Sequence, residues 1–208
     1  MKRLAILGAS GHGKVVADTA EICGWGEVSF FDDAWPDKNM NGQWRIVGNT
    51  ETLLQSLDQF EGVVVAIGNN GIRKQKMDML IQENAVLVSI IHPTAVISRY
   101  VSIGEGSVVF ANVVVNVGAK VGGGVILNTA CSVDHDCKLG DAVHISPGAH
   151  IAGDVWIGEA SWVGIGASVR QGIHIGELVV VGAGACVISD IIDEATVVGV
   201  PAKARHEC

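Results

Sequence analysis

The chain has 208 residues, with 14 Lys and Arg against 22 Asp and Glu, and therefore a formal net charge of −8. This length allows one domain or two small ones, and the negative charge makes nucleic acid and anionic lipid improbable partners. No apolar run approaches the roughly 18 residues that span a bilayer, and the five scattered cysteines do not form a disulfide framework. We therefore expect a soluble cytoplasmic protein without membrane insertion.

Residues 1–90 alternate short apolar runs with helical patterns. The expected strands are Arg3–Leu7, Val28–Phe31 and Val63–Ile67. A helix is expected over Lys14–Cys23, and a second one after Asn70, ending near Glu83. The polar segment Trp35–Trp44 contains Pro, Asn and Gly and is expected to be a loop. This order predicts an α/β domain, a small parallel sheet of Rossmann-like topology.

A glycine-rich turn, Gly8–Gly13, links the first strand to the first helix. Backbone N–H groups at a helix N-terminus suit an anion, here a diphosphate. The dinucleotide fingerprint G-x-G-x-x-G fails in both possible registers, because it would require glycine at Ser10 or Val16. A nicotinamide cofactor is therefore not expected. The alternative is that the glycines only let strand and helix pack closely.

From residue 91 onward, an aliphatic residue recurs at every sixth position. The series is Ile91, Ile97, Ile103, Val109, Val115, Val121, Leu127, Val133, Leu139, Ile145, Ile151, Ile157, Val163, Val169, Ile175, Val181 and Val187. A period of six fits neither a helix nor a single strand, but it fits a solenoid of short parallel strands joined by turns. We therefore predict a second domain over residues 91–208, a β-helix with a C-terminal tail.

Two further features follow this repeat. Glycine comes directly after the aliphatic residue in seven repeats, where we expect turns with positive φ: Gly104, Gly122, Gly140, Gly158, Gly164, Gly176 and Gly182. Cys131 and Cys137 occupy the small-residue position four places after the aliphatic one. We expect them inside the solenoid with raised pKa values, not as nucleophiles.

The hexapeptide segment resembles the left-handed parallel β-helix of the hexapeptide-repeat acyltransferases, in which three hexapeptides form one triangular coil. The whole chain is similar to the NeuD/PglD branch, which includes the bacillosamine-pathway N-acetyltransferases and the sialic acid O-acetyltransferases. The matching segments are Gly8–Gly13, Asp32-Asp33, Ala66–Asn70, Ile72–Lys74, Leu127–Thr129, Gly148-Ala149 and Gly199–Lys203. The resemblance implies homotrimers that bind CoA in clefts between neighbouring solenoids.

The same resemblance implies which residues meet the nucleotide-linked sugar. It places Ser10, Gly11 and His12 against the substrate, and Asp32, Asp33 and Gly68 around the nucleotide and sugar. The two aspartates can accept hydrogen bonds from a base or from hydroxyls. Three basic side chains are possible local counter-charges or solvated surface groups: Lys14, Arg73 and Lys74.

If a coil has 18 residues, positions 18 apart stack about 4.8 Å from one another. His135 then stacks between Val117 and Gly153, and His144 on Trp162. Carboxylates beside His135 can orient its imidazole and raise its basicity.

The run Val133–Cys137 resembles the family's catalytic His followed by an acidic residue, although Asp136 is one methylene shorter than the Glu that is common there. The resemblance therefore implies that His135 and Asp136 are catalytic. It also implies that His144, Gly153, Ile165 and Ala183 line the acetyl-CoA site.

The remaining histidines carry no such pattern. We expect His150, His174 and His206 at the surface and a structural role for His92 beside Pro93. The spacings among His135, His144 and His150 do not match the ligand pattern of zinc-dependent carbonic anhydrases of this fold, so no metal is expected.

Together these features predict an acetyl-CoA-dependent N-acetyltransferase that acts on the 4-amino group of a UDP-4-amino-4,6-dideoxy sugar by direct transfer. Gly153 N–H is a candidate donor to the developing oxyanion. The alternatives are sugar O-acetylation of the sialic acid type, a non-catalytic sugar-nucleotide-binding scaffold, and a metallohydratase.

Overall fold

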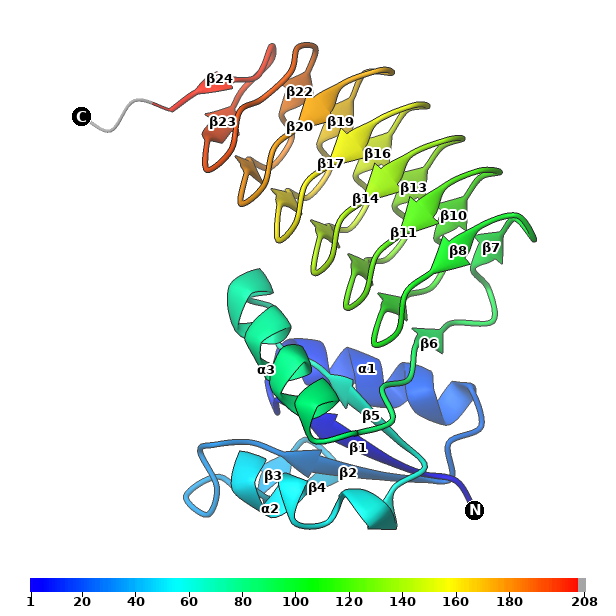
Figure 1. Cartoon of the computed structure of the whole chain (residues 1–208), viewed down its shortest axis with the longest axis vertical. Helices are drawn as coiled ribbons and strands as arrows, with labels where there is room; N and C mark the ends of the chain where they lie inside the picture. The colour runs from blue at the N-terminus through cyan, green and yellow to red at the C-terminus, as the bar shows by residue number, and fades with distance from the viewer. Residues whose placement is uncertain (206–208) are drawn as a thin grey trace. The chain divides into compact units, whose positions relative to one another are not determined.

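The computed structural model describes residues 1–205, which form two compact units that divide at Pro93 and Thr94 (Figure 1). The sequence places this boundary near residue 90. His206, expected at the surface, and the end of the expected C-terminal tail lie outside the described residues. Within residues 1–205, no helix has the length and apolar character needed to cross a membrane.

The first unit is a five-stranded sheet in the order β3-β4-β2-β1-β5. The strands are β1 Arg3–Leu7, β2 Glu27–Phe31, β3 Met40–Asn41, β4 Trp44–Gly48 and β5 Gly62–Val65. The helices are α1 Gly11–Ile22, α2 Thr50–Leu54 and α3 Asn70–Gln82, with a 3₁₀ turn at Leu57–Gln59 and β6 at Ile90–Ile91. Strand β1 pairs in parallel with both β2 and β5, which is the predicted Rossmann-like arrangement.

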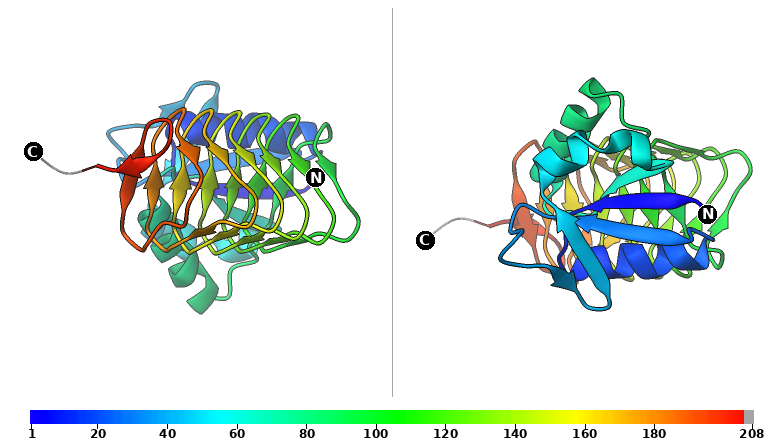
Figure 2. Two further views of the ribbon diagram at one scale, coloured as in Figure 1. Left: turned by 90° about the horizontal axis from the view of Figure 1, so that it is seen from above. Right: turned by 90° about the horizontal axis from the view of Figure 1, so that it is seen from below.

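The helices cover both faces of this sheet (Figure 2). Ala5 and Leu7 of β1 share a core with Leu53 of α2 and with Met77 and Leu80 of α3. Figure 2 shows α1 on the opposite side of the sheet from α2 and α3. At the carboxyl ends of β1 and β5, the chain continues into the glycine turn before α1 and into the turn before α3.

The segment expected to be a loop, Trp35–Trp44, instead contains strand β3 and ends in β4. The two strands form an antiparallel hairpin, with Gly42 in the turn at φ +67°. Strand β4 alternates buried Trp44, Ile46 and Gly48 with two exposed residues, which is the period-2 pattern of a half-buried strand. The prediction was wrong here because turn residues surround these short strands and hide this alternation.

The second unit is a left-handed parallel β-helix with three sheets, as predicted. One sheet contains β7 Val96–Ile97, β10 Val114–Val115, β13 Ser132–Val133, β16 His150–Ile151, β19 Ser168–Val169 and β22 Cys186–Val187. A second contains β8 Ser102–Ile103, β11 Lys120–Val121, β14 Lys138–Leu139, β17 Trp156–Ile157 and β20 His174–Ile175. The third contains β9 Val108–Val109, β12 Ile126–Leu127, β15 His144–Ile145, β18 Trp162–Val163, β21 Val180–Val181, β23 Thr196–Val198 and β24 Lys203–Ala204.

From β7 to β22, neighbouring strands in each sheet pair residues that are 18 apart, for example Val115 with Val133 and Leu127 with Ile145, whereas β21 and β23 pair residues that are 16 apart. In the strands from β7 to β22, the second residue is the repeated aliphatic one; it points into the solenoid, where most of the series is buried. Outward-pointing residues therefore also stack in columns 18 residues apart. The number of a residue thus fixes its neighbours in the adjacent coils.

Left-handed backbone recurs every six residues, but not at the glycines for which positive φ is expected. It occurs at Gly106, Asn112, Gly118, Gly124, Ala130, Asp136, Ala142, Gly148, Asp154, Ala160, Gly166, Gly172, Leu178 and Gly184. The seven glycines after the aliphatic residues are needed for another reason, which is close packing between coils. A Cβ on Gly140, for example, would lie 2.7 Å from the backbone nitrogen of Glu159 in the next coil.

These two kinds of glycine should respond differently to alanine. Gly140→Ala forces a methyl group into the next coil's backbone, so we expect a loss of about 2–3 kcal/mol or more in the free energy of unfolding. Gly148→Ala has open space around the new Cβ, so the left-handed backbone is the only source of destabilisation. We expect it to lower the free energy of unfolding by about 1–2 kcal/mol. Urea unfolding of the two variants measures the difference. Equal losses would contradict the packing explanation.

Candidate functional site

The first unit contains a cavity of about 360 Å³ at the carboxyl ends of its parallel strands. It is lined by Leu7, Gly8, Ala9, Ser10, Asp32, Asp33, Ala66, Ile67, Gly68, Ile72 and Lys76. Four of the six residues predicted to meet the nucleotide sugar are therefore in the lining: Ser10, Asp32, Asp33 and Gly68. The other two, Gly11 and His12, begin α1 directly behind Ser10.

The glycine turn packs tightly as well as lining the cavity. Gly8 has φ +109°, and a Cβ there would lie 2.8 Å from Ile67 Cγ1 and 2.9 Å from the Ala66 carbonyl oxygen. A Cβ on Gly13 would lie 2.5 Å from the carbonyl oxygen of Gly8. The packing role considered as the alternative for these glycines is thus present, and it coexists with the cavity.

Asp32 holds the glycine turn in place through its carboxylate. Its Oδ2 accepts a hydrogen bond from Ala9 N–H at 2.6 Å, and its Oδ1 accepts one from Ala34 N–H at 3.0 Å. The Lys38 ammonium donates to the carbonyl oxygen of Ala9. The carboxylate predicted to face the ligand therefore also fixes the shape of the ligand site.

Asp33 is held by two donors on the cavity wall. Its Oδ1 accepts from Thr50 N–H at 2.9 Å, and its Oδ2 pairs with Lys76 Nζ at 2.9 Å. Burial alone would raise the pKa of Asp33, but hydrogen bonds from Thr50 and Lys76 and the charge of Lys76 outweigh it and lower the pKa to about 2. Asp33 is therefore ionised at neutral pH.

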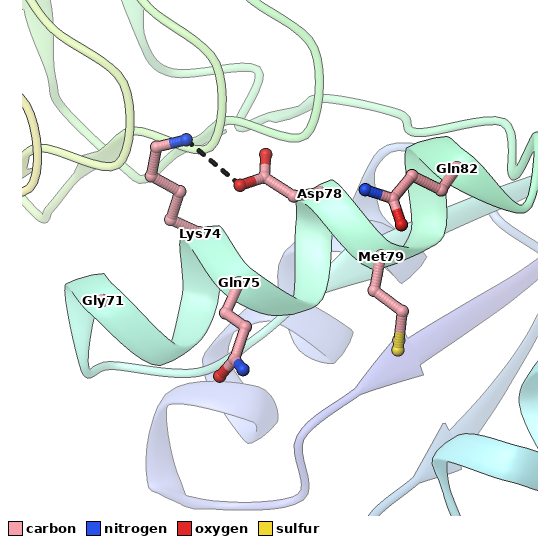
Figure 3. Close-up of a pocket in the computed structure, with 6 residues that line it drawn as sticks. All are labelled: Gly71, Lys74, Gln75, Asp78, Met79 and Gln82. Atoms are coloured by element: carbon pink, nitrogen blue, oxygen red, sulfur yellow. Dashed lines mark hydrogen bonds and ion pairs between the residues drawn. The ribbon is translucent and has the colours of Figure 1, made fainter.

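Lys76 is the basic residue that lines the cavity, and it is not among the residues predicted from the sequence. The available signal was its position one helical turn after Ile72, which places both side chains on one face of α3. The basic residues considered instead lie differently. Lys14 is exposed, and Lys74 pairs with Asp78 at 3.1 Å beside a separate hollow of about 440 Å³ on α3 (Figure 3).

The second candidate site is a corner of the β-helix between β13 and β14. There His135 Nδ1 lies 2.9 Å from Asp136 Oδ2. Asp136 has left-handed backbone, with φ 60°, a conformation that aspartate tolerates better than most residues. The shorter acid therefore still reaches the imidazole.

Two glycines make room for this pair. Gly153, one coil after His135, lies so close to the imidazole that a Cβ there would be 2.5 Å from His135 Cε1. Gly118, one coil before Asp136, lies so close that a Cβ would overlap the carboxylate oxygen Oδ1. The predicted stacking of His135 and Gly153 is confirmed, and it leaves no space for a larger residue.

The electrostatics of the corner favour the protonated form of His135. Asp134 accepts hydrogen bonds from His135 N–H and from Asn116 Nδ2, each at 2.8 Å. The hydrogen bond that His135 donates to Asp136, and then the charges of Asp134, Asp136 and Asp154, raise the pKa of His135 above its ordinary value. Such an imidazole is a stronger base once deprotonated, which suits removal of a proton from a nucleophile.

The residues predicted to line the acetyl-CoA site do not meet within one chain. Gly153 lies beside His135, whereas His144 is on β15 of another sheet. His144 is buried, stacks on Trp162 with ring centroids 5.5 Å apart as predicted, and has Nε2 3.2 Å from Asn128 Nδ2. Ile165 and Ala183 stack above one another at a third place, the turns after β18 and β21.

The cysteine prediction is confirmed. Cys131 and Cys137 are fully buried, and burial raises the pKa of Cys131 to about 12 and also raises that of Cys137. Both thiols are therefore protonated and shielded.

His150 and His174 are exposed, as predicted, and His92 is half-buried. Among residues 1–205, no group of three His, Cys, Asp or Glu side chains is placed to hold a metal ion.

The chain joins a Rossmann-like unit with a cavity to a hexapeptide β-helix that carries a His–Asp pair, which is the arrangement that the resemblance to the hexapeptide-repeat acyltransferases predicts. Residues 3–80 match the PglD N-terminal domain family. A curated relative, UDP-N-acetylbacillosamine N-acetyltransferase of Bacillus subtilis (strain 168), is 35% identical over 113 residues. That alignment spans about half of each protein, 53% of this chain and 52% of the relative.

Solved structures extend the similarity to the whole chain. The acetyltransferase domain of PglB from Neisseria gonorrhoeae FA1090 is 45% identical with a TM-score of 0.93, over 99% of this chain and 100% of that one. PerB from Caulobacter crescentus is 36% identical with a TM-score of 0.94, over 99% and 98%. The chain therefore belongs to the PglD-type sugar N-acetyltransferases.

Proposed function

We propose that this enzyme transfers the acetyl group of acetyl-CoA to the 4-amino group of a UDP-4-amino-4,6-dideoxy sugar, a bacillosamine-type step in glycan biosynthesis. The name of the Bacillus relative supports a UDP-linked amino sugar. The gonococcal domain has been solved in complex with acetyl coenzyme A, and PerB in complex with CoA and GDP-perosamine. These complexes support acetyl-CoA and a nucleotide-linked amino sugar as the two substrates.

The nucleotide sugar is assigned to the cavity of the first unit. Its diphosphate would meet the N–H groups at the start of α1, where the Ser10 side chain makes no capping hydrogen bond. Lys76 supplies positive charge on the opposite wall, and Asp33 and Gly68 contribute acceptors and backbone near the base and sugar. Gly11 and His12 would contribute through their backbone N–H groups at the N-terminus of α1.

Acetyl transfer is assigned to the corner at His135. The neutral imidazole takes a proton from the sugar amine as the nitrogen attacks the thioester carbonyl carbon. The carbonyl oxygen becomes an oxyanion, for which Gly153 N–H is the candidate donor. Collapse of this intermediate breaks the C–S bond and gives the amide, and the departing thiolate of CoA takes up a proton. Asp136 orients the imidazole and stabilises its charged form.

The observation that carries this proposal is the His135–Asp136 hydrogen bond over Gly153. The assay is thiol release from acetyl-CoA with UDP-linked and GDP-linked 4-amino sugars and with a UDP-linked sugar that has only hydroxyl groups. We expect turnover with the UDP-linked amino sugar. Activity confined to the hydroxyl sugar would favour O-acetylation, and no thiol release with any acceptor would contradict the enzymatic proposal.

The His135 variants test the mechanism in the same assay. His135→Ala should lower kcat by about 10²–10⁴, and Asp136→Asn by about tenfold. Because His135 must be neutral and its pKa is raised, native activity should fall on the acid side at a pH above 6.5. This acid-side fall of the pH–rate profile should be absent in His135→Ala and should move to lower pH in Asp136→Asn. Near-native kcat for His135→Ala at pH 7 would show that the base lies elsewhere.

We also propose a homotrimer in which neighbouring β-helices complete the acetyl-CoA site. The support is that Gly153 and the pair Ile165 and Ala183 lie at different corners of one solenoid, so a single chain does not gather them. Light scattering should give a mass of about three times 21.7 kDa. A monomer at micromolar concentration that still turns over both substrates would contradict the shared site.

A further inference from the structure

Arg73 is the largest fully buried side chain among the described residues, with 1% of its surface exposed. It lies in the first turn of α3, on the face that packs against the sheet. A buried guanidinium costs free energy unless it is hydrogen-bonded, so its partners indicate what it does. Burial lowers the pKa of Arg73 only to about 10, and the group is therefore charged at neutral pH.

Three hydrogen-bond acceptors of Arg73 lie in the turn between β5 and α3 or at the first residue of α3. Nη1 donates to the carbonyl oxygens of Ile67 at 2.9 Å and Gly68 at 3.3 Å. Nη2 donates to Asn70 Oδ1 at 2.9 Å. The planar fork of the guanidinium thus fixes two successive peptide groups and one side chain at once.

This turn forms one wall of the nucleotide cavity, since Ile67 and Gly68 line it. The glycine turn forms the adjacent wall, because Gly8 packs directly against Ile67. In a trans peptide the N–H points away from the C=O. With the Ile67 and Gly68 carbonyls turned toward Arg73, the N–H groups of Gly68 and Asn69 are directed away from the guanidinium.

We propose that Arg73 is a positioning residue of the nucleotide site: it fixes the Ile67–Asn70 turn so that the backbone N–H groups of Gly68 and Asn69 are presented to the nucleotide sugar. This inference rests on the proposed function of the cavity. It adds that one wall of the site is shaped from beneath by a buried cation that does not line the cavity. The charge also lies near His12 at the start of α1, where burial and then Arg73 lower the pKa of His12 to about 4.

A purely structural arginine would give a different result from a positioning one. Loss of a core side chain would lower the melting temperature and impair both substrates alike. Loss of a positioning residue should weaken nucleotide binding selectively, because the acetyl-CoA residues lie in the other unit. Partial rescue by lysine, which keeps the charge but not the fork, would further separate these roles.

The test compares Arg73→Met and Arg73→Lys with Arg45→Met, a control that removes the same charge from an exposed position on β4. Calorimetry measures the Kd of UDP, of GDP and of acetyl-CoA for each protein, and kinetics measures the KM of the nucleotide sugar. We expect Arg73→Met to raise the Kd of the tighter nucleoside diphosphate and the KM about tenfold or more, the scale of one lost charge-assisted hydrogen bond. The Kd of acetyl-CoA should stay within threefold of the native value. The nucleotide Kd of Arg73→Lys should lie between those of the native protein and Arg73→Met, and Arg45→Met should match the native protein.

Three results would overturn the inference. These are native nucleotide affinity in Arg73→Met, a parallel loss of affinity for both substrates, and, if Arg73→Met does not fold, native nucleotide affinity in a folded Arg73→Lys. A native protein that binds neither UDP nor GDP would instead overturn the assignment of the cavity itself, and the role of Arg73 with it.

Discussion

From β7 to β22, the second unit depends on one geometric constraint, the stacking of residues that are 18 apart in the sequence. Each strand of the β-helix has only two or three residues, so a strand alone has little stability, and the hydrogen bonds to the coils above and below hold it. This register gives every outward-pointing side chain a fixed neighbour in each adjacent coil. It places Gly153 against His135 and Gly118 against Asp136, so the His135–Asp136 pair stands in space that two glycines leave open. The chemistry assigned to this corner is therefore a consequence of sequence spacing.

Because the repeat is so regular, most of the second unit could be predicted from the sequence. The period of six identified the β-helix, and the period of 18 identified the stacks of His135 on Gly153 and of His144 on Trp162. The left-handed backbone was assigned to the wrong residues. Across the repeats, glycine serves two needs, positive φ at one position and close packing of coils at another, and the sequence alone does not distinguish them. Asp136 shows that non-glycine residues also occupy the left-handed position.

The first unit was less predictable because long-range contacts shape its site. The strands and the glycine turn followed from local pattern, and four of the six expected substrate residues line the cavity. The sequence does not show that the Asp32 carboxylate accepts a hydrogen bond from Ala9 N–H or that Lys76 pairs with Asp33. It also does not show that Arg73 donates to the carbonyl oxygen of Gly68. These contacts join segments that are distant in the chain or lie beneath the surface. The two units thus form their sites by different means: repetition of backbone in one, and buried polar anchors in the other.

The central claim is that the space above Gly153 positions His135 for proton removal. The most direct measurement is kcat of Gly153→Ala at saturating concentrations of both substrates, with the melting temperature and acetyl-CoA affinity as controls. The new methyl group would displace the flexible imidazole from Asp136 rather than unfold the coil. The account predicts a kcat at least about tenfold lower, part of the ~10²–10⁴ that a general base contributes, with little change in melting temperature. A folded variant with kcat within threefold of the native value would contradict it.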